Sequence, residues 1–169
     1  MNNIGKGWGL KMTNIKEVKR LLDKWQDILR LRDWDIKIKM VDTEWRKSGD
    51  VKIDIDNSNA ILLINSNSKF ENLEELVVHE LLHVKLWRMD QMIEKSIIRE
   101  FGEDDSCPKK DFAMNHFFMT LESTVEDLAK GFLAANGSKE ALSMGRLRRE
   151  VEGEIGEVEN IYDTIEEDQ

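Results

Sequence analysis

The sequence has little of three residue types that often carry structure or chemistry. It contains one cysteine, one proline and three histidines among 169 residues. A single thiol, Cys107, excludes an internal disulfide, and it has no second cysteine with which to bind a metal. Residues 1–10 also lack the continuous apolar run of a signal peptide or membrane anchor. We therefore expect a cytoplasmic chain that folds around a single core without disulfides.

Positive charge is also scarce. Lysine and arginine number 25 against 34 acidic residues, which gives a formal net charge of -9. Residues 150–169 carry nine acidic residues and no lysine or arginine, so this tail holds the whole excess and residues 1–149 are neutral. Neither part offers the basic surface that nucleic-acid binding usually needs. We expect neither nucleic acid nor a membrane to be a partner.

Three segments in the first half of the chain have the patterns of strands. Residues 34–40 and 51–55 alternate apolar with polar side chains, and residues 60–64 are continuously apolar. Turn-forming residues at 57–59 predict that the last two strands form a hairpin. The strand at residues 60–64 is either internal or presents an edge with which an extended peptide can pair, and its five apolar residues fit both alternatives.

Three further segments have the spacing of helices. Residues 15–29 place apolar side chains three and four positions apart, and Asn14 is followed three residues later by a glutamate, which is a capping pattern. Asn72 begins the same pattern for a second helix that runs to about residue 101. The only proline suits the first turn of a third helix, at residues 108–135.

The acidic tail has a weaker helical pattern. Its apolar residues recur at spacings of four and three, although two glycines interrupt them. We favour a solvated or partly frayed helix, and the alternative is a helix that self-associates, or that docks on the domain and inhibits it. The sequence thus divides into a domain at residues 1–137 and an acidic helical tail at residues 138–169.

A pair of histidines stands out because of its surroundings. His79-Glu80-Leu81-Leu82-His83 lies in a stretch, residues 76–87, that is otherwise almost entirely apolar. Residues four apart share one helix face, so both imidazoles can bind one ion while Glu80 faces a water molecule beside it. Burying these polar groups costs free energy unless they have partners, which favours a metal over histidines satisfied within the core.

A catalytic zinc needs a third protein ligand from another segment. The third helix offers His116, Glu122 and Glu126. On a helical wheel Glu122 points into the apolar face, where a carboxylate needs a cation, whereas His116 falls on the polar side and can be solvated. Glu122 is therefore the predicted ligand. Glu126 either hydrogen-bonds a motif imidazole or forms an ordinary helix ion pair with Lys130.

With these residues the chain resembles the gluzincin clan of zinc metallopeptidases, specifically the small minigluzincin-like and phage-associated proteins with an HExxH helix and a downstream Glu-x-x-x-Glu/Asp helix. The resemblance implies one Zn²⁺ ion, which the two motif histidines and the first downstream glutamate bind. The second downstream glutamate would form a hydrogen bond that supports these ligands. The residues that carry the resemblance are His79, Glu80, His83, Glu122 and Glu126.

The resemblance also implies a fold. That fold is α+β and zincin-like, with a small antiparallel or mixed three-stranded sheet packed on an N-terminal helix and the central HExxH helix, followed by the glutamate-bearing helix. The chain departs from the larger relatives in having Leu121 before the first glutamate, where they have an asparagine. It also lacks an obvious tyrosine or histidine to stabilise the oxyanion, and His116 and Tyr162 are the two candidates.

The function expected from these observations is a zinc-dependent metallopeptidase acting on peptides or proteins. Water activated by the zinc would attack the peptide carbonyl, with Glu80 as the general base. One alternative is a non-catalytic, zinc-stabilised binding or regulatory module of a phage or mobile element. Another is a regulatory protease that cuts a single protein partner.

Overall fold

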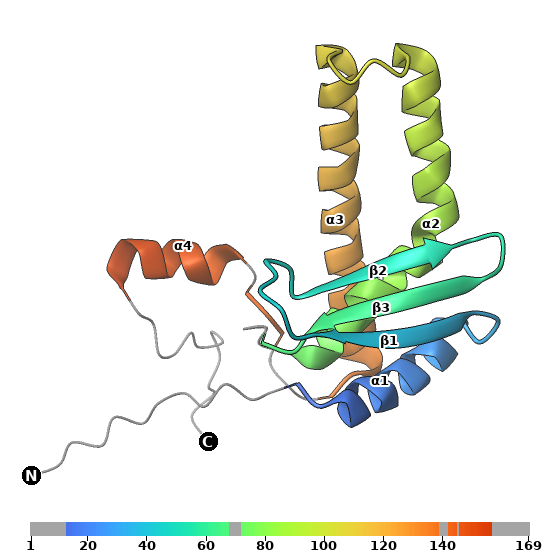
Figure 1. Cartoon of the computed structure of the whole chain (residues 1–169). Coiled ribbons are helices and arrows are strands. Elements are labelled where there is room, and N and C mark those ends of the chain that lie inside the picture. The colour runs from blue at the N-terminus through green and yellow to red at the C-terminus, as the bar shows by residue number, and fades with distance from the viewer. Residues whose placement is uncertain (1–12, 68–71, 139–141, 145, 157–169) are drawn as a thin grey trace, which may run out of the picture.

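The computed structural model describes residues 13–67, 72–138, 142–144 and 146–156, which form an α+β fold. α1 and α2 pack on one face of a small sheet, α3 packs on α2, and α2 and α3 continue beyond the sheet as a long antiparallel pair (Figure 1). In chain order the elements are α1 (Ile15–Ile28), β1 (Asp35–Val41), β2 (Gly49–Asp54), β3 (Asn59–Asn65), α2 (Leu73–Phe101), α3 (Pro108–Asn136) and α4 (Arg146–Ile155).

The three strands form a mixed sheet in the order β1-β3-β2. β2 and β3 pair antiparallel, which confirms the predicted hairpin, whereas β1 and β3 pair parallel. β3 therefore lies between the other two strands, and both of its backbone edges are already paired. The alternative that residues 60–64 present a free edge to a peptide is wrong, and among the described residues no strand pairs with the outer edges of β1 and β2.

One core joins the sheet to the helices. The predicted caps are present at both helix starts, where Asn14 Oδ1 accepts from the Lys16 amide at 2.9 Å and Asn72 Oδ1 from the Glu75 amide at 3.1 Å. Side chains from α1, the inner face of β3, α2 and α3 are almost fully buried together, and they include Val18, Trp25, Leu62, Ile64, Val77, Leu81 and Val125. The HExxH segment thus lies in the part of α2 that packs in this core. The C-terminal part of α2 extends beyond the core.

The start of α2 is fixed by a buried carboxylate. Glu74 is 3% exposed, and it accepts hydrogen bonds from Lys24 Nζ at 2.6 Å, Trp25 Nε1 at 2.8 Å and the Ser138 amide at 2.8 Å. Burial alone would raise the pKa of Glu74, but the bonds from Lys24, Ser138 and Trp25 outweigh it and lower the pKa to about 2. This one side chain therefore links α1, α2 and the end of α3.

Replacing Glu74 by glutamine should lower the free energy of unfolding at pH 7 by about 2 kcal/mol, a value reduced for solvent screening at the partly exposed Lys24. The folded pKa of about 2 lies below the ordinary 4.5, so this stabilisation is present above pH 4.5 and is lost as the pH falls towards 2. Urea unfolding of both proteins at pH 7 and pH 3 measures the difference. Glu100→Gln, on the exposed part of the same helix, should show no such dependence.

The neighbouring carboxylate attaches the chain beyond α3. Glu75 accepts from the Ser143 amide at 2.8 Å and from the Ser143 hydroxyl at 2.6 Å. At the start of α2 the Asn72 side chain therefore caps the Glu75 amide, whereas the Glu75 side chain binds the segment that follows α3. Contacts of this kind cross the predicted boundary between residues 137 and 138, so the packed unit extends at least to Ser143.

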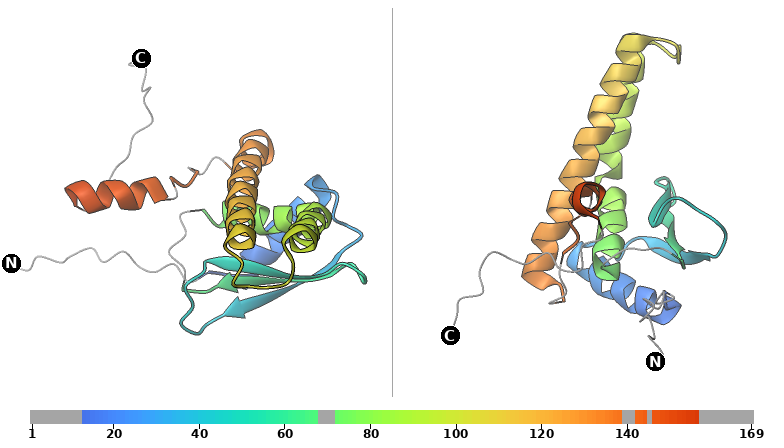
Figure 2. Two further views of the ribbon diagram at one scale, coloured as in Figure 1. Left: turned by 90° about the horizontal axis from the view of Figure 1, so that it is seen from above. Right: turned by 90° about the vertical axis from the view of Figure 1, so that its left-hand side faces the viewer.

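α4 lies apart from the rest of the fold. Figures 1 and 2 show it projecting from the side of the molecule, and Leu147 and Ile155 are 56% and 74% exposed. For these residues the tail is a solvated helix, and Gly156, with φ 86°, follows its end. Residues 157–169, with Tyr162, lie outside the described part of the chain. Within the described part, no helix combines the length and apolar content needed to cross a bilayer.

Candidate metal centre

α2 and α3 bring two imidazoles and one carboxylate together. His79 Nε2 and His83 Nε2 lie 3.3 Å apart, and the Glu122 carboxylate lies 3.4 Å from the first and 3.5 Å from the second. Among the residues that the structure describes, this is the only group of three or more histidine, cysteine or acidic side chains with ligand atoms close enough to share an ion. The geometry therefore joins the two motif histidines to the predicted third ligand.

The spacing of these atoms fits a tetrahedral zinc. With zinc bonds of about 2.0–2.2 Å, two ligand atoms of a tetrahedron are separated by about 3.3–3.5 Å. The separation of the two imidazole nitrogens, 3.3 Å, is close to that value, and so are the distances from His79 Nε2 to Glu122 Oε2, 3.4 Å, and from His83 Nε2 to Glu122 Oε1, 3.5 Å. One atom from each of the three residues lies within 4.8 Å of the other two. Two imidazole nitrogens facing each other at 3.3 Å also repel through their lone pairs unless a proton or a cation lies between them. The donor set and its spacing both suit zinc, with one position left open.

Glu126 supports the first histidine from the other side of its ring. Its carboxylate lies 3.3 Å from His79 Nδ1, and Lys130 Nζ lies 2.9 Å from the other oxygen of the same carboxylate. Both interactions expected of Glu126 are thus present at once. A proton on Nδ1 leaves Nε2 of His79 with its lone pair free for a metal, which is the usual role of such a carboxylate.

Replacing Glu126 by glutamine should weaken zinc binding about 10- to 100-fold, because the amide supports the imidazole less strongly than a carboxylate does. Competition against a chromogenic zinc chelator at pH 7.5 measures the change in affinity. Asp127→Asn, an exposed neighbour on α3 that is not part of the group, should bind zinc as the native chain does. Equal affinities for the two variants would contradict the supporting role of Glu126.

The side chain of Glu80, on α2, is buried against β2. It is 7% exposed, and burial raises its pKa to about 7. The backbone of β2 approaches closely, because a Cβ added to Gly49 would lie 2.9 Å from Glu80 Oε1 and 2.9 Å from Leu76 Cδ1. A side chain at residue 49 would therefore force the ends of Glu80 and Leu76 to shift. A carboxyl with its pKa near neutrality can both accept and return a proton.

The surroundings favour a neutral His83 and an ionised Glu122, as a metal requires, whereas in the metal-free protein they favour the protonated form of His79. Burial lowers the pKa of His83, which keeps that ring neutral. Burial also opposes the charged form of His79, but its hydrogen bond to Glu122 and the charge of Glu80 outweigh this and raise its pKa. The same bond to His79 lowers the pKa of Glu122, which is therefore ionised. A cation can replace the proton shared by His79 and Glu122.

Two charged residues just before and within β2, Lys47 and Asp50, also act on Glu80. Asp50 raises the pKa of Glu80, and Lys47 lowers it, so both lie within electrostatic range of the site. Asn65 holds this segment in place, because its Nδ2 donates to the carbonyl oxygens of Trp45 and Lys47 at 3.0 Å each. No motif marks these residues, since their relation to Glu80 arises only when β2 packs against α2.

Glu122 does not lie in the buried face of α3, where the helical wheel predicted it. The buried stripe of α3 consists of Leu121, Val125 and Ala129, each four residues from the next, and Glu122 lies beside it. Its side chain is 60% exposed, so the carboxylate does not need a cation to offset burial. What places Glu122 with the histidines is the pairing of α3 with α2, which a wheel for one helix does not contain.

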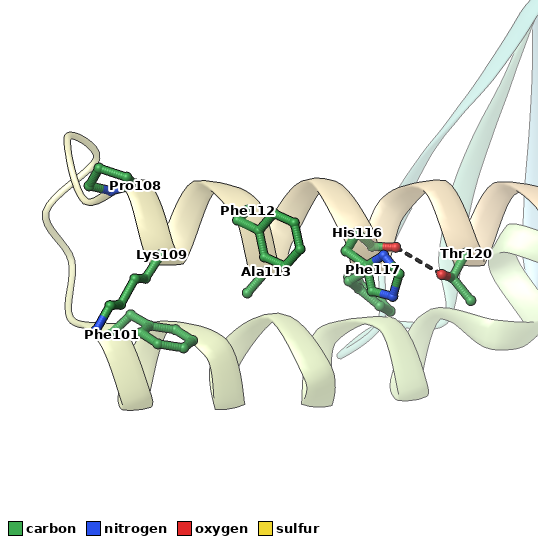
Figure 3. A pocket seen from close by; sticks show the side chains of 8 residues that line it. All are labelled: Phe101, Pro108, Lys109, Phe112, Ala113, His116, Phe117 and Thr120. Atoms are coloured by element: carbon green, nitrogen blue, oxygen red, sulfur yellow. Dashed lines mark hydrogen bonds between the residues drawn. The ribbon is translucent and has the colours of Figure 1, made fainter.

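His116 lies outside the group. Its ring stacks on Phe112, with centroids 6.1 Å apart, near the far end of the helix pair. Figure 3 shows both residues beside an apolar hollow of about 750 Å³ that Phe101 and Phe117 also line. The other oxyanion candidate, Tyr162, is outside the described residues. Neither candidate is brought to Glu80 by the part of the chain that the structure describes.

Comparisons of the chain with protein-family models, with curated proteins and with solved structures find no match.

Proposed function

We propose that this chain is a zinc metallopeptidase with a zincin-like fold, related to the gluzincins. The observation that carries the proposal is the group of His79, His83 and Glu122, whose ligand atoms lie within 4.8 Å of one another, next to the buried carboxylate of Glu80. Metal ligands and a general base on one helix are the components that hydrolysis of a peptide bond requires.

In this proposal His79, His83 and Glu122 hold the ion, and Glu126 orients His79. When bound, zinc supplies a Lewis acid that lowers the pKa of water to about 7. Glu80 then accepts the proton of the attacking water and donates it to the leaving amine. Its raised pKa, about 7, suits both transfers near neutral pH. Packing of Glu80 against Gly49 keeps bulk water from one side of the carboxylate.

The substrate would lie along β2. Among the described residues no strand pairs with its outer edge, and its first residue, Gly49, touches Glu80. An extended peptide that adds to the sheet at this edge gains main-chain hydrogen bonds and brings a carbonyl near the site. In this proposal β2, and not the strand at residues 60–64, is the strand with which the extended peptide pairs.

The direct test is to measure zinc in the purified protein and cleavage of a random peptide library by mass spectrometry. We expect about one zinc per chain, and cleavage that a chelator abolishes and added zinc restores. One zinc with no cleavage of any peptide would instead support a non-catalytic module in which the ion braces α2 against α3. Cleavage of one protein only, with the library and casein untouched, would support the partner-specific protease.

A further inference from the structure

A lysine lies beside the proposed cleavage site in the segment that enters β2. Lys47 precedes Gly49 by two residues, and its carbonyl is fixed by Asn65 Nδ2 at 3.0 Å. Its ammonium lies 3.2 Å from Asp50 Oδ2. The backbone of Lys47 is thus held near Glu80, whereas its side chain, 60% exposed, reaches from the surface.

The charge of Lys47 acts on the site itself. Burial has the largest effect on the pKa of Glu80 and of His83, and the hydrogen bond to His79 on that of Glu122, but the charge of Lys47 also lowers all three pKa values, so its ammonium lies within electrostatic range of the site. The other charged side chains close to the imidazoles are the carboxylates of Glu80, Glu122 and Glu126. With zinc bound, the ion attracts the carbonyl of the scissile bond, and Lys47 is a cation that acts on Glu80, His83 and Glu122 from the β2 side, where it can attract a second, anionic group of the substrate.

Lys47 can leave its present partner at little cost. Asp50 accepts from two lysines, with Lys52 Nζ at 2.6 Å and Lys47 Nζ at 3.2 Å from the same oxygen. When Lys47 turns away, Asp50 therefore keeps the shorter of its two ion pairs. An ion pair this exposed contributes little to stability, and a second carboxylate can replace Asp50 as the partner of the ammonium.

We propose that Lys47 binds a carboxylate of the substrate, so that the site selects peptides with an acidic residue next to the scissile bond. The inference rests on the peptidase function proposed above and names its substrate class. Asp50 holds the ammonium in place until a substrate carboxylate takes over, and the free edge of β2 sets the distance between that carboxylate and Glu80. Lys47 is thus a specificity-determining residue.

The test compares peptides that differ only by glutamate or glutamine at one position flanking the scissile bond. With the zinc-loaded native chain, we expect kcat/KM about tenfold higher for the glutamate peptide at one of these positions. Lys47→Gln should remove this preference, and Lys47→Glu should shift it towards a lysine peptide. Lys37→Gln, which removes a lysine paired with an aspartate on the opposite edge strand, should keep it.

A second measurement separates the two proposals. In the zinc-loaded Glu80→Gln variant, affinities for the same peptides are measured by fluorescence anisotropy, with and without Lys47→Gln. Cleavage without an acidic preference, or a preference that survives Lys47→Gln, would overturn the role of Lys47 and leave the peptidase intact. If no peptide is cut by the native chain, the peptidase proposal fails. Lys47-dependent binding of the acidic peptide would still support the anion-binding role, and its absence would overturn that role.

Discussion

Replacing Glu80 by glutamine is expected to lower kcat/KM about 10²- to 10⁴-fold while one zinc stays bound. Glutamine has nearly the same shape and fills the space beside Gly49, but it cannot accept the proton of the attacking water. The loss should appear in kcat, because substrate binding along β2 does not use this carboxylate. Single-peptide kinetics together with metal analysis of the same sample measure both quantities. Full activity in Glu80→Gln would contradict the assigned general base.

The same substitution has an opposite effect on stability in the metal-free protein. The folded pKa of Glu80, about 7, lies above its ordinary 4.5, so the folded state holds the proton more tightly between these values. Stability therefore falls as the pH rises from 4.5 through 7. Metal-free Glu80→Gln should be more stable than the native chain at pH 8, by about 2–3 kcal/mol, and equal to it near pH 4. Glu100→Gln, on the exposed part of α2, serves as the control for both effects.

Replacing His79 by alanine is expected to weaken zinc binding by more than about 100-fold, because it removes a ligand and also leaves Glu126 with no ring to orient. The native chain should gain about 4 kcal/mol of stability when free zinc is about 1,000 times its Kd. His79→Ala should gain about 1.4 kcal/mol or less at the same zinc concentration, because that concentration is then about 10 times its Kd or lower. Calorimetric titration and melting curves with and without zinc measure the two effects.

The matched control is His116→Ala, which removes the histidine outside the group. Its ring stacks on Phe112, away from the three ligand atoms, so its zinc affinity should equal that of the native chain. If His79→Ala bound zinc as tightly as His116→Ala does, the ion would be held elsewhere. The assignment of His79, His83 and Glu122 would then be wrong.

The features that the sequence predicted well depend on residues close together in the chain. Asn14 and Asn72 cap their helices through amides two and three residues later. The hairpin of β2 and β3 follows from turn residues between two strand patterns, and the positions of His79 and His83 follow from the helical repeat. Each of these is decided within a few residues, so periodicity and capping chemistry are sufficient to predict it.

What the sequence did not reveal depends on contacts between distant segments. The central position of β3 is set by its parallel pairing with β1, for which no local pattern exists. Glu75 accepts hydrogen bonds from two donors of Ser143, a contact across 68 positions of the chain that no local pattern predicts. Glu122 was selected for a burial that it does not have, and the pairing of α2 with α3 places it correctly. Lys47 approaches Glu80 only because β2 packs on α2.

The residues that would hold the ion and the residues that tune the base come from different parts of the fold. His79, His83, Glu122 and Glu126 all belong to the single antiparallel pair of α2 and α3, whereas the enclosure of Glu80 depends on β2 at Gly49. The metal-binding part is therefore modular: grafted into an unrelated helical bundle, it would carry its coordination with it. Such a graft would lack the sheet that buries the carboxylate of Glu80. It would therefore be expected to bind zinc but not to hydrolyse peptides.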